Sequence, residues 1–113
     1  MRIVNVEDVT AKDTPFPGIE RKTLAHGDRM SAIQTILPKG TTAELHSHPH
    51  EHLRFCLQGR IEVSMHGETG ICEAGGSWVV PGDVEHAAHA LEDSLILEVF
   101  SPCLLYTSPS PRA

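Results

Sequence analysis

Four histidines lie within seven residues of this chain, at His46, His48, His50 and His52, and the chain has eight histidines in all. Neutral imidazole is a preferred ligand of zinc, copper, iron and nickel, so a cluster of this kind indicates a transition-metal site. Side chains alternate between the two faces of a strand, so histidines spaced by two residues would begin on one face. Pro49 disfavours a regular strand across the cluster, so the four need not all stay on that face.

The elements that would hold these side chains are predicted to be strands. No segment repeats apolar residues at the spacing of an amphipathic helix, whereas short β-branched runs recur between turns. Strands are expected at residues 3–6, 31–37, 51–57, 60–66, 70–73, 77–80, 86–91 and 95–100. The segments between them carry the Gly, Pro and Asp of tight turns, and residues 10–17 are expected to form an arm or a loop. Evenly spaced short strands predict an all-β jelly roll or closed barrel.

Length and composition restrict the class of protein. A chain of 113 residues can bury one hydrophobic core, so a single domain is expected. The formal charge is −6 without a lysine–arginine cluster, so neither nucleic acid nor a membrane is an expected partner. The first residues lack the pattern of a secretory signal, and the localisation is left open. It would be extracellular if the substrate is a polymer, and cytoplasmic otherwise.

The spacing around the histidine cluster resembles the first sequence motif of the cupins. Gly40 is followed after five residues by His46 and His48. His52 comes after three more residues, and Gly59 after a further six. The cupin motif usually has Glu or Gln where this chain has His52.

A second stretch resembles the second cupin motif and contributes another histidine. Gly75 is followed after five residues by Pro81, and His86 comes five positions after Pro81. The two motifs occur in order, at residues 40–59 and 75–90. The chain is therefore identified as a small single-domain metallo-cupin, which implies an RmlC-like jelly-roll barrel, also called a double-stranded β-helix.

The resemblance also implies a set of metal ligands. Three histidines are expected to converge inside the barrel on one divalent metal, namely His46, His48 and His86. His52 holds the position of the family's fourth ligand, whereas His50 is expected to point elsewhere. Rigid strands can bring imidazoles to about 2 Å from one ion without rearranging the backbone. An all-nitrogen ligand set favours copper, with iron, nickel, zinc and manganese as alternatives.

The end of the chain differs in character from the rest. The cupin domain is expected to span residues 1–102. Residues 103–113 resemble the translation of a transposase sequencing adapter rather than the end of a barrel strand. We expect an adapter-derived or disordered tail there, which would make this a gene assembled from metagenomic reads.

Two groups of carbohydrate-related cupins resemble this chain and imply different chemistry. The first group consists of compact copper cupins of metagenomic origin that cleave cellulose oxidatively. They imply a histidine-held copper that reacts with O2 or H2O2 and attacks a carbohydrate polymer. A copper-dependent oxidoreductase acting on a polysaccharide is therefore the first functional hypothesis, and it requires no organic cofactor.

The alternative is a redox-neutral isomerase resembling the cupins that ketonise unsaturated uronates. Those enzymes carry an acid–base Asp and a carboxylate-binding Arg, at the positions of Glu98 and Leu104 in this chain. Glu98 is expected in an apolar setting that would favour the neutral acid. Arg54 falls on the His52 face of its strand by period 2 and could replace the missing Arg. Glu98 and Arg54 are therefore the candidate catalytic residues.

A third hypothesis is a non-enzymatic cupin that binds a metal or a small ligand. Whatever the chemistry, cupin barrels commonly pair through strand exchange or sheet packing. Residues 1–6 would form an edge strand that needs cover. A homodimer is therefore expected by resemblance.

Overall fold

The computed structural model describes residues 1–101, and within that range it contains ten strands and one short 3-10 helix. The predicted tail at residues 103–113 lies outside the described residues. The elements are η1 (Val6–Asp8), β1 (Lys12–Asp13), β2 (Glu20–His26), β3 (Ser31–Leu37), β4 (Thr42–His46), β5 (Glu51–Gln58), β6 (Arg60–Met65), β7 (Glu68–Glu73), β8 (Ser77–Val80), β9 (His86–Ala90) and β10 (Ser94–Ser101).

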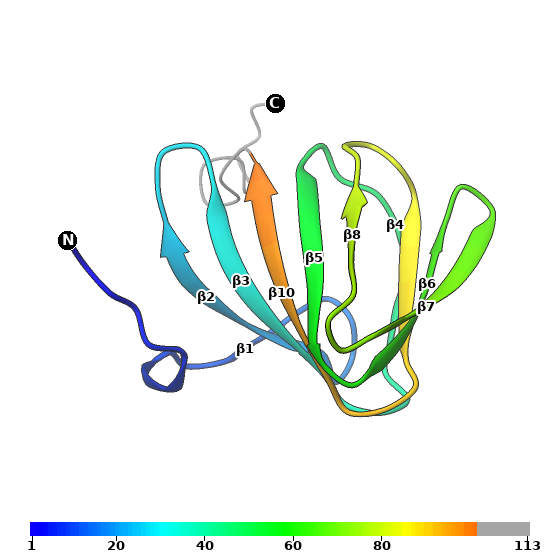
Figure 1. The fold of residues 1–113 in the computed structure, drawn as a ribbon, viewed down its shortest axis with the longest axis horizontal. Helices are drawn as coiled ribbons and strands as arrows, with labels where there is room; N and C mark the ends of the chain where they lie inside the picture. The colour runs from blue at the N-terminus through cyan, green and yellow to red at the C-terminus, as the bar shows by residue number, and fades with distance from the viewer. Residues whose placement is uncertain (102–113) are drawn as a thin grey trace.

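The strands form two antiparallel sheets (Figure 1). One sheet has six strands in the order β1-β2-β3-β10-β5-β8, and the other has four in the order β4-β9-β6-β7. Consecutive strands such as β4 and β5, or β9 and β10, lie in different sheets, which is the connectivity of a jelly roll. The all-β jelly-roll prediction is confirmed. None of the described residues forms a helix long and apolar enough to cross a membrane.

Most of the predicted strands have a counterpart in the structure. Those at residues 31–37 and 77–80 coincide with β3 and β8, and five others differ by one or two residues at an end. The sequence did not predict β2 or β4. Neither strand alternates buried and exposed residues, because β4 is the edge of its sheet and β2 has only the two-residue β1 outside it. Strand β1 lies within the segment that was predicted to be a loop.

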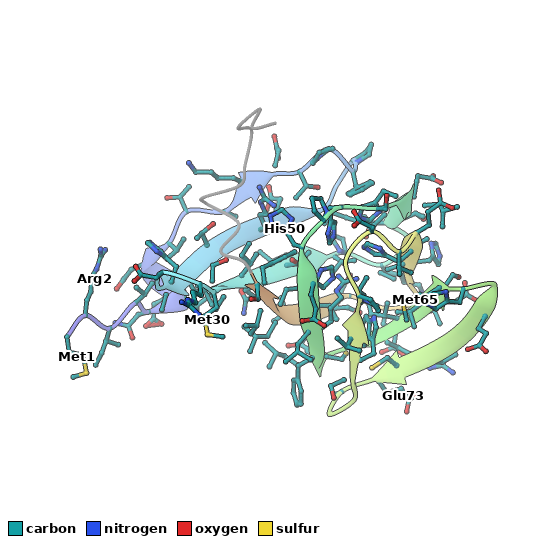
Figure 2. The ribbon with its side chains drawn as sticks, turned by 90° about the horizontal axis from the view of Figure 1, so that it is seen from above. Met1, Arg2, Met30, His50, Met65 and Glu73 are labelled. Carbon is teal, nitrogen blue, oxygen red and sulfur yellow. The ribbon has the colours of Figure 1, made fainter. Side chains whose placement is uncertain are left out.

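The strand predicted at residues 3–6 is wrong. Residues 1–5 form no strand, and Val6 begins η1. Met1 and Arg2 lie apart from the rest of the described chain (Figure 2), and Ile3 is 72% exposed. An apolar run forms a strand only where a neighbouring strand supplies backbone partners, and at this sheet edge the pairing with β2 is made by β1.

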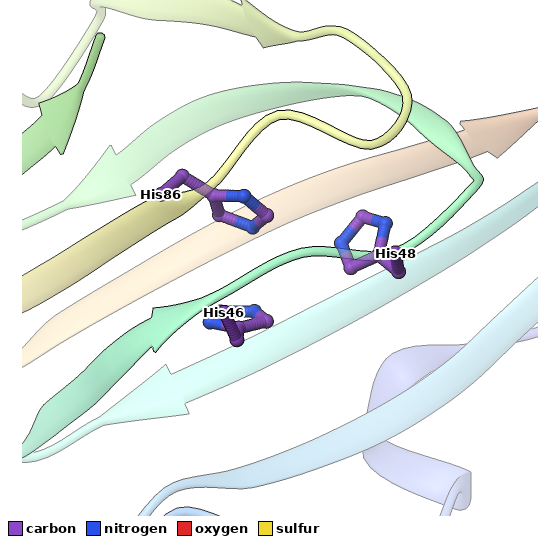
Figure 3. Close-up of side chains that lie close together, drawn as sticks. All are labelled: His46, His48 and His86. Atoms are coloured by element: carbon purple, nitrogen blue, oxygen red, sulfur yellow. The ribbon is translucent and has the colours of Figure 1, made fainter.

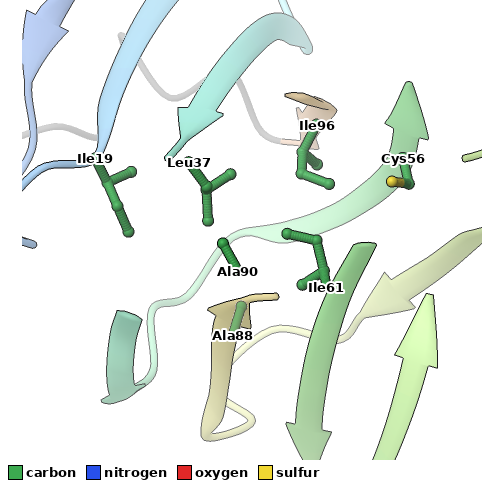
Figure 4. Packing of buried hydrophobic residues seen from close by; sticks show 7 residues of the cluster. All are labelled: Ile19, Leu37, Cys56, Ile61, Ala88, Ala90 and Ile96. Carbon is green, nitrogen blue, oxygen red and sulfur yellow. The ribbon is translucent and has the colours of Figure 1, made fainter. Parts of the chain in front are cut away.

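The hydrophobic core lies between the two sheets and contains side chains from both. Figure 4 shows its seven buried residues, Ile19, Leu37, Cys56, Ile61, Ala88, Ala90 and Ile96. Buried positions alternate with half-buried ones along the whole of β3 and most of β10. Because the side-chain period of a strand is two, each such strand contributes every second residue to the interior.

Two polar layers follow the core along β5 and β10. The inward-facing pairs in register are Ile96 with Cys56, then Glu98 with Arg54, then Phe100 with His52. Each step of two residues advances about 7 Å along a strand. The barrel interior therefore changes from apolar, to charged, to histidine-lined within the length of one strand.

Candidate metal centre

Three histidines lie close together at the histidine-lined end of the barrel. His46 ends β4 and pairs with His86, the first residue of β9, while His48 follows His46 by two residues. One ligand atom from each of the three lies within 4.8 Å of those of the other two. Figure 3 shows the three rings grouped around a common space. Three imidazoles arranged in this way could hold one metal ion.

Backbone carbonyl groups fix the orientation of these three rings. The Nδ1 atoms of His46 and His86 lie 2.7 and 2.8 Å from the carbonyl oxygens of the residues two positions earlier. Nδ1 of His48 lies 3.1 Å from the carbonyl oxygen of His50. A carbonyl oxygen only accepts, so each Nδ1 donates a hydrogen bond and the free lone pair is on Nε2. Histidines that bind a metal usually donate their other ring N–H in the same way. This hydrogen bond fixes the tautomer and so leaves one ring nitrogen free to bind the metal.

His52 lies beside this group but is held differently. It is 3% exposed, and neither of its ring nitrogens has a hydrogen-bond partner. Its ring centroid is 4.9 Å from that of His48 and 5.5 Å from that of His86. Buried polar atoms without a partner are rare. A metal bound to His52 would supply a partner for one of its two ring nitrogens. The donor set therefore fits a divalent transition metal, and His52 stays the predicted fourth ligand although it lies outside the group of three.

His50 lines the same cavity, a position that the sequence did not predict. It is 6% exposed, and its ring centroid is 5.6 Å from that of His48. It does not belong to the group of three whose ligand atoms converge. Its contribution to that group is its carbonyl oxygen, which accepts the hydrogen bond from His48.

The turn of the second cupin motif holds the segment that carries His48. The backbone N–H of Asp83 donates to the carbonyl oxygen of His48 at 2.7 Å. A Cβ atom added to Gly82 would lie 2.5 Å from the carbonyl oxygen of Pro49, so glycine is required by this close approach. The two motifs are thus in direct contact, and the position of His48 depends on both.

Burial favours the neutral form of three histidines of the site, namely His48, His52 and His86. It lowers the pKa of His52 to about 3 and the pKa of His86 to about 4. It also lowers the pKa of His48, and the neighbouring charges of His46 and His50 act in the same direction. Only neutral imidazole binds a metal, so protons compete weakly for these three nitrogens at neutral pH.

A buried ionised carboxylate, that of Glu98, lies next to the histidine layer. Its Oε2 accepts hydrogen bonds from Thr35 Oγ1 at 2.7 Å and from Arg54 Nη2 at 2.9 Å. Burial alone would raise the pKa of Glu98, but the charge of Arg54 and these two hydrogen bonds lower it below its ordinary value. The expectation of a neutral acid in an apolar setting is therefore wrong, because the register of β5 and β10 places a guanidinium beside it.

Arg54 points into the barrel, on the face that period 2 predicted. It is 7% exposed, and its guanidinium carbon lies 5.2 Å from the centre of the Trp78 ring. Its Nε atom is buried and has no hydrogen-bond partner. Because Arg54 already forms an ion pair with Glu98, its charge is partly neutralised, and a substrate carboxylate would have to compete for it.

A cavity of about 230 Å³ connects these layers. Its wall combines the site histidines, Glu98 and Arg54 with apolar side chains such as Phe16, and it includes the exposed Arg21. Arg21 pairs in register with Thr35, so both side chains lie on the face of the sheet that lines the barrel interior. Sequence reasoning missed both residues. Period 2 along residues 31–37 could have indicated Thr35, whereas Arg21 lies on the unpredicted strand β2.

This double-sheet barrel is the fold of a small cupin of one compact domain, and the histidines that converge at one end of it could bind a metal. The comparison with protein families agrees: the cupin domain matches residues 32–102. The chain therefore belongs to the cupin domain family. The matched residues contain every predicted ligand and both members of the Arg54–Glu98 pair.

Several known proteins are similar to this chain. L-ectoine synthase of Wolinella succinogenes is 34% identical over 90 residues, which are 76% of this chain and 69% of that protein. The solved structure of KdgF from Halomonas sp. has a TM-score of 0.84 at 32% identity, covering 89% of this chain and 94% of that chain. An RmlC-like cupin from Shewanella frigidimarina has a TM-score of 0.83 at 24% identity, covering 90% and 91% of the two chains, and shows the shared fold.

Proposed function

We propose that this protein is a metal-dependent, redox-neutral enzyme that acts on a small sugar acid, with the ketonisation of an unsaturated uronate as its reaction class. One observation carries the proposal. Imidazoles that fit a metal and an ionised carboxylate, that of Glu98, line a single cavity. A Lewis acid and a proton carrier in one site suit the transfer of a proton between oxygen and carbon. The sequence resemblance to uronate-ketonising cupins and the structural likeness to KdgF support this choice.

The histidines would hold the metal. His46, His48 and His86 are the predicted ligands, with His52 as the fourth. When bound, a divalent metal supplies Lewis acidity that polarises a carbonyl or hydroxyl oxygen of a substrate. The chain itself contributes rigidity, because the hydrogen bonds to Nδ1 keep three rings oriented with Nε2 available.

Glu98 would carry the proton. Thr35 and Arg54 both bind Oε2, so Oε1 is the oxygen that can face a substrate. As a carboxylate, Glu98 can take a proton from a substrate hydroxyl and return it to a neighbouring carbon, which is the net change in ketonisation. The two hydrogen bonds to Oε2 fix the carboxylate plane and keep its charge available for the first of these transfers.

Arg21 would bind the carboxylate of the sugar acid. The family position for this function corresponds to Leu104, which cannot form an ion pair. Arg21 lines the cavity from β2 and is exposed, so its guanidinium can take up a carboxylate in two parallel hydrogen bonds. Arg54 is a poorer candidate because Glu98 already occupies its Nη2.

The all-nitrogen donor set favours a second candidate, the copper-dependent oxidoreductase acting on a polysaccharide such as cellulose. The size of the cavity favours the first candidate. A volume of about 230 Å³ lies below the roughly 300–1,000 Å³ of typical ligand pockets, which suits a small molecule better than a polymer. The relative named as a synthase of L-ectoine also supports chemistry on a small molecule.

The test begins with the metal-loaded protein and an unsaturated uronate. Samples loaded separately with zinc, nickel, manganese, iron or copper are assayed for loss of the substrate's ultraviolet absorbance. We expect turnover with at least one metal, and a rate lower by about 10²- to 10⁴-fold in Glu98→Gln, which removes the proton carrier. Glu68→Gln, a change of an exposed glutamate, is the matched control and should keep the full rate.

Four results would contradict the proposal. No absorbance loss across uronates with any metal would exclude ketonisation as the reaction. An equal rate in Glu98→Gln and Glu68→Gln would exclude Glu98 as the proton carrier. Oxidised oligosaccharides formed by the copper-loaded protein with a reductant would establish the second candidate. Stoichiometric metal binding without turnover in either assay would indicate a binding cupin.

A further inference from the structure

We infer that Phe16 is a substrate-binding residue of this site, and that its aromatic ring packs against one face of the sugar ring. The inference rests on the proposed function for the class of substrate. It adds a binding residue from a part of the chain that the match to the cupin domain does not include. That match covers residues 32–102, whereas Phe16 lies in the loop between β1 and β2.

The loop that carries Phe16 is braced by its own hydrogen bonds. Thr14 Oγ1 donates to the carbonyl oxygen of Ile19 at 2.8 Å and accepts from the backbone N–H of Phe16 at 3.1 Å. The backbone N–H of Ile19 donates to the carbonyl oxygen of Phe16 at 3.1 Å, and the backbone N–H of Thr14 donates to that of Ile19 at 3.2 Å. Compact surface loops that are held in this way frequently carry functional residues.

Two further contacts fix the loop against the barrel. Ile19 is 3% exposed and belongs to the hydrophobic core cluster, on which Phe16 also packs. Gly18 has a φ of 82°, in the left-handed region, and a Cβ atom there would lie 3.0 Å from Cγ2 of Thr41, the residue before β4. The loop is therefore in position before a substrate arrives, and a preorganised wall loses little conformational freedom on binding.

Phe16 lies beside the first of the predicted metal ligands. Its ring centroid is 4.8 Å from that of His46, and the two rings are inclined at 50°. Phe16 is half-buried, and its side chain forms part of the wall of the cavity that also contains the site histidines. A molecule held in this cavity next to His46 would therefore contact the ring of Phe16.

The chemistry of a sugar acid matches the side chains of this wall. Arg21 is proposed to bind the carboxylate and Glu98 to move the proton, and both line the same cavity as Phe16. A sugar ring carries hydroxyl groups around its edge and C–H groups on its faces. The face of an aromatic ring is electron-rich and attracts C–H groups, so Phe16 suits the face of a sugar ring. Apolar and aromatic walls with a few orienting polar groups are typical of small-molecule sites.

A second phenylalanine, Phe100, lines the same cavity but presents less surface to it. Phe100 is 7% exposed, and its ring lies against three histidines. Its ring centroid is 4.5 Å from that of His52 and 5.8 Å from those of His48 and His50. Because these contacts cover Phe100, the half-buried Phe16 is the ring that a substrate can pack against.

Calorimetric titration of the zinc-loaded protein with glucuronate tests the inference. Glucuronate is a saturated sugar acid without a double bond to ketonise, so it measures binding without turnover. We expect its affinity to fall by about 10-fold in Phe16→Ala and by about 3- to 10-fold in Phe16→Leu, which stays apolar but loses the flat ring. Phe55→Ala is the matched control, because Phe55 is 41% exposed on the outward side of β5, and it should keep the wild-type affinity.

The affinity for zinc separates substrate binding from mere support of His46. Phe16→Leu keeps an apolar side chain against the core and against His46, so its zinc affinity and its urea midpoint should match those of the wild type. A loss of zinc affinity equal to the loss of glucuronate affinity would show that Phe16 only supports His46, and would overturn the inference. Unchanged glucuronate affinity in Phe16→Leu, or a wild type that does not bind glucuronate, would overturn it as well.

The inference and the proposed function can fail separately. Glucuronate binding that depends on Phe16, without ketonisation of an unsaturated uronate by any metal-loaded sample, would refute the proposed reaction and leave Phe16 as a binding residue. Where ketonisation occurs, the KM of the unsaturated uronate should rise about 10-fold in Phe16→Ala with little change in kcat. Packing against the ring stabilises the bound substrate and the transition state alike. Turnover with an unchanged KM would overturn the inference alone.

Discussion

Four imidazoles of identical chemistry have different surroundings in this site. His46, His48 and His86 each have Nδ1 bound to a backbone carbonyl oxygen, which fixes their tautomer. His52 is buried with both ring nitrogens unpartnered. A buried polar group without a partner destabilises the fold by about 1–3 kcal/mol, so His52 gains most when a ligand arrives.

Replacing His52 tests its role as a ligand. His52→Gln restores the oxygen donor that the cupin motif usually has at this position, so we expect copper affinity to fall by at least about 10- to 100-fold. Affinity for manganese should fall less, because manganese prefers oxygen. Competition with a coloured chelator measures both. His66→Gln, on an exposed turn, is the control, and equal affinities in the two variants would exclude His52 from the ligand set.

Thr35 offers a test of how Glu98 is kept ionised. The hydrogen bond from Thr35 helps to lower the pKa of Glu98, so Thr35→Val should raise that pKa. Activity that needs the carboxylate is lost as the pH falls through this pKa. The acid limb of the kcat/KM profile should therefore move to higher pH in Thr35→Val, with a smaller change near neutral pH. An acid limb at the wild-type position would show that Glu98 does not control it.

At the scale of elements, the site depends on the contact between two loops that are far apart in sequence. The segment after β4 carries His48, and the turn before β9 donates the Asp83 N–H to it. Gly82 lets the two backbones approach, since a Cβ there would lie 2.5 Å from the Pro49 carbonyl oxygen. The strands on either side are anchored by the sheet, so a shift at this contact would move His48 relative to His46 and His86.

Gly82→Ala should therefore weaken metal binding without removing any ligand. The added methyl group has to displace the Pro49 backbone, which overpacks the contact and should destabilise the fold by about 1–3 kcal/mol. Gly70→Ala is the matched control, because a Cβ at Gly70 meets nothing within 4 Å and its φ is not positive. Isothermal titration with zinc and a urea melt measure the two effects. Similar values for both alanine variants would contradict the proposed contact.

At the scale of the whole molecule, the apolar core and the polar site occupy different parts of the barrel interior. The apolar core cluster closes one part of the interior, and the charged and histidine layers occupy the rest. The polar layers contain groups that ionise differently in the folded and unfolded chain. Folding stability is therefore linked to pH through the site rather than through the core.

The metal-free protein should lose stability as the pH falls from about 6.5 towards 4. The unfolded chain protonates its histidines near 6.5, whereas the pKa of folded His86 is about 4 and that of folded His52 about 3. The unfolded state then binds more protons, so acid favours unfolding across this window, and the full contribution is present above pH 6.5. The lowered pKa of Glu98 adds to this loss of stability only below its ordinary value of 4.5, where the unfolded chain protonates this carboxylate before the folded chain does.

Urea midpoints of the metal-free protein between pH 4.5 and 7.5 measure this dependence. His52→Gln should flatten the curve, because it removes one of the two groups with the most depressed pKa values. His66→Gln should leave the curve unchanged. A midpoint that stays constant down to pH 5 in the wild type would contradict the linkage.

The sequence by itself determined the features that depend on local periodicity and spacing. Short β-branched runs between turns predicted the strands at residues 31–37, 51–57 and 95–100. Period 2 predicted the inward direction of Arg54, because a strand repeats every two residues whatever it pairs with. The two motifs brought His46, His48 and His86 into one prediction, and the structure places these three together. The all-β class followed from the same short-range signals, and the jelly roll was implied by the resemblance to the cupin motifs.

Only the tertiary structure decided which side chains face each other across strands. Arg54 and Glu98 are 44 positions apart, and the register of β5 against β10 makes them a buried ion pair, so Glu98 is ionised rather than neutral. The place of His50 and Arg21 in the cavity wall has the same origin. Register is set by the packing of the complete barrel, and no local stretch of sequence contains it.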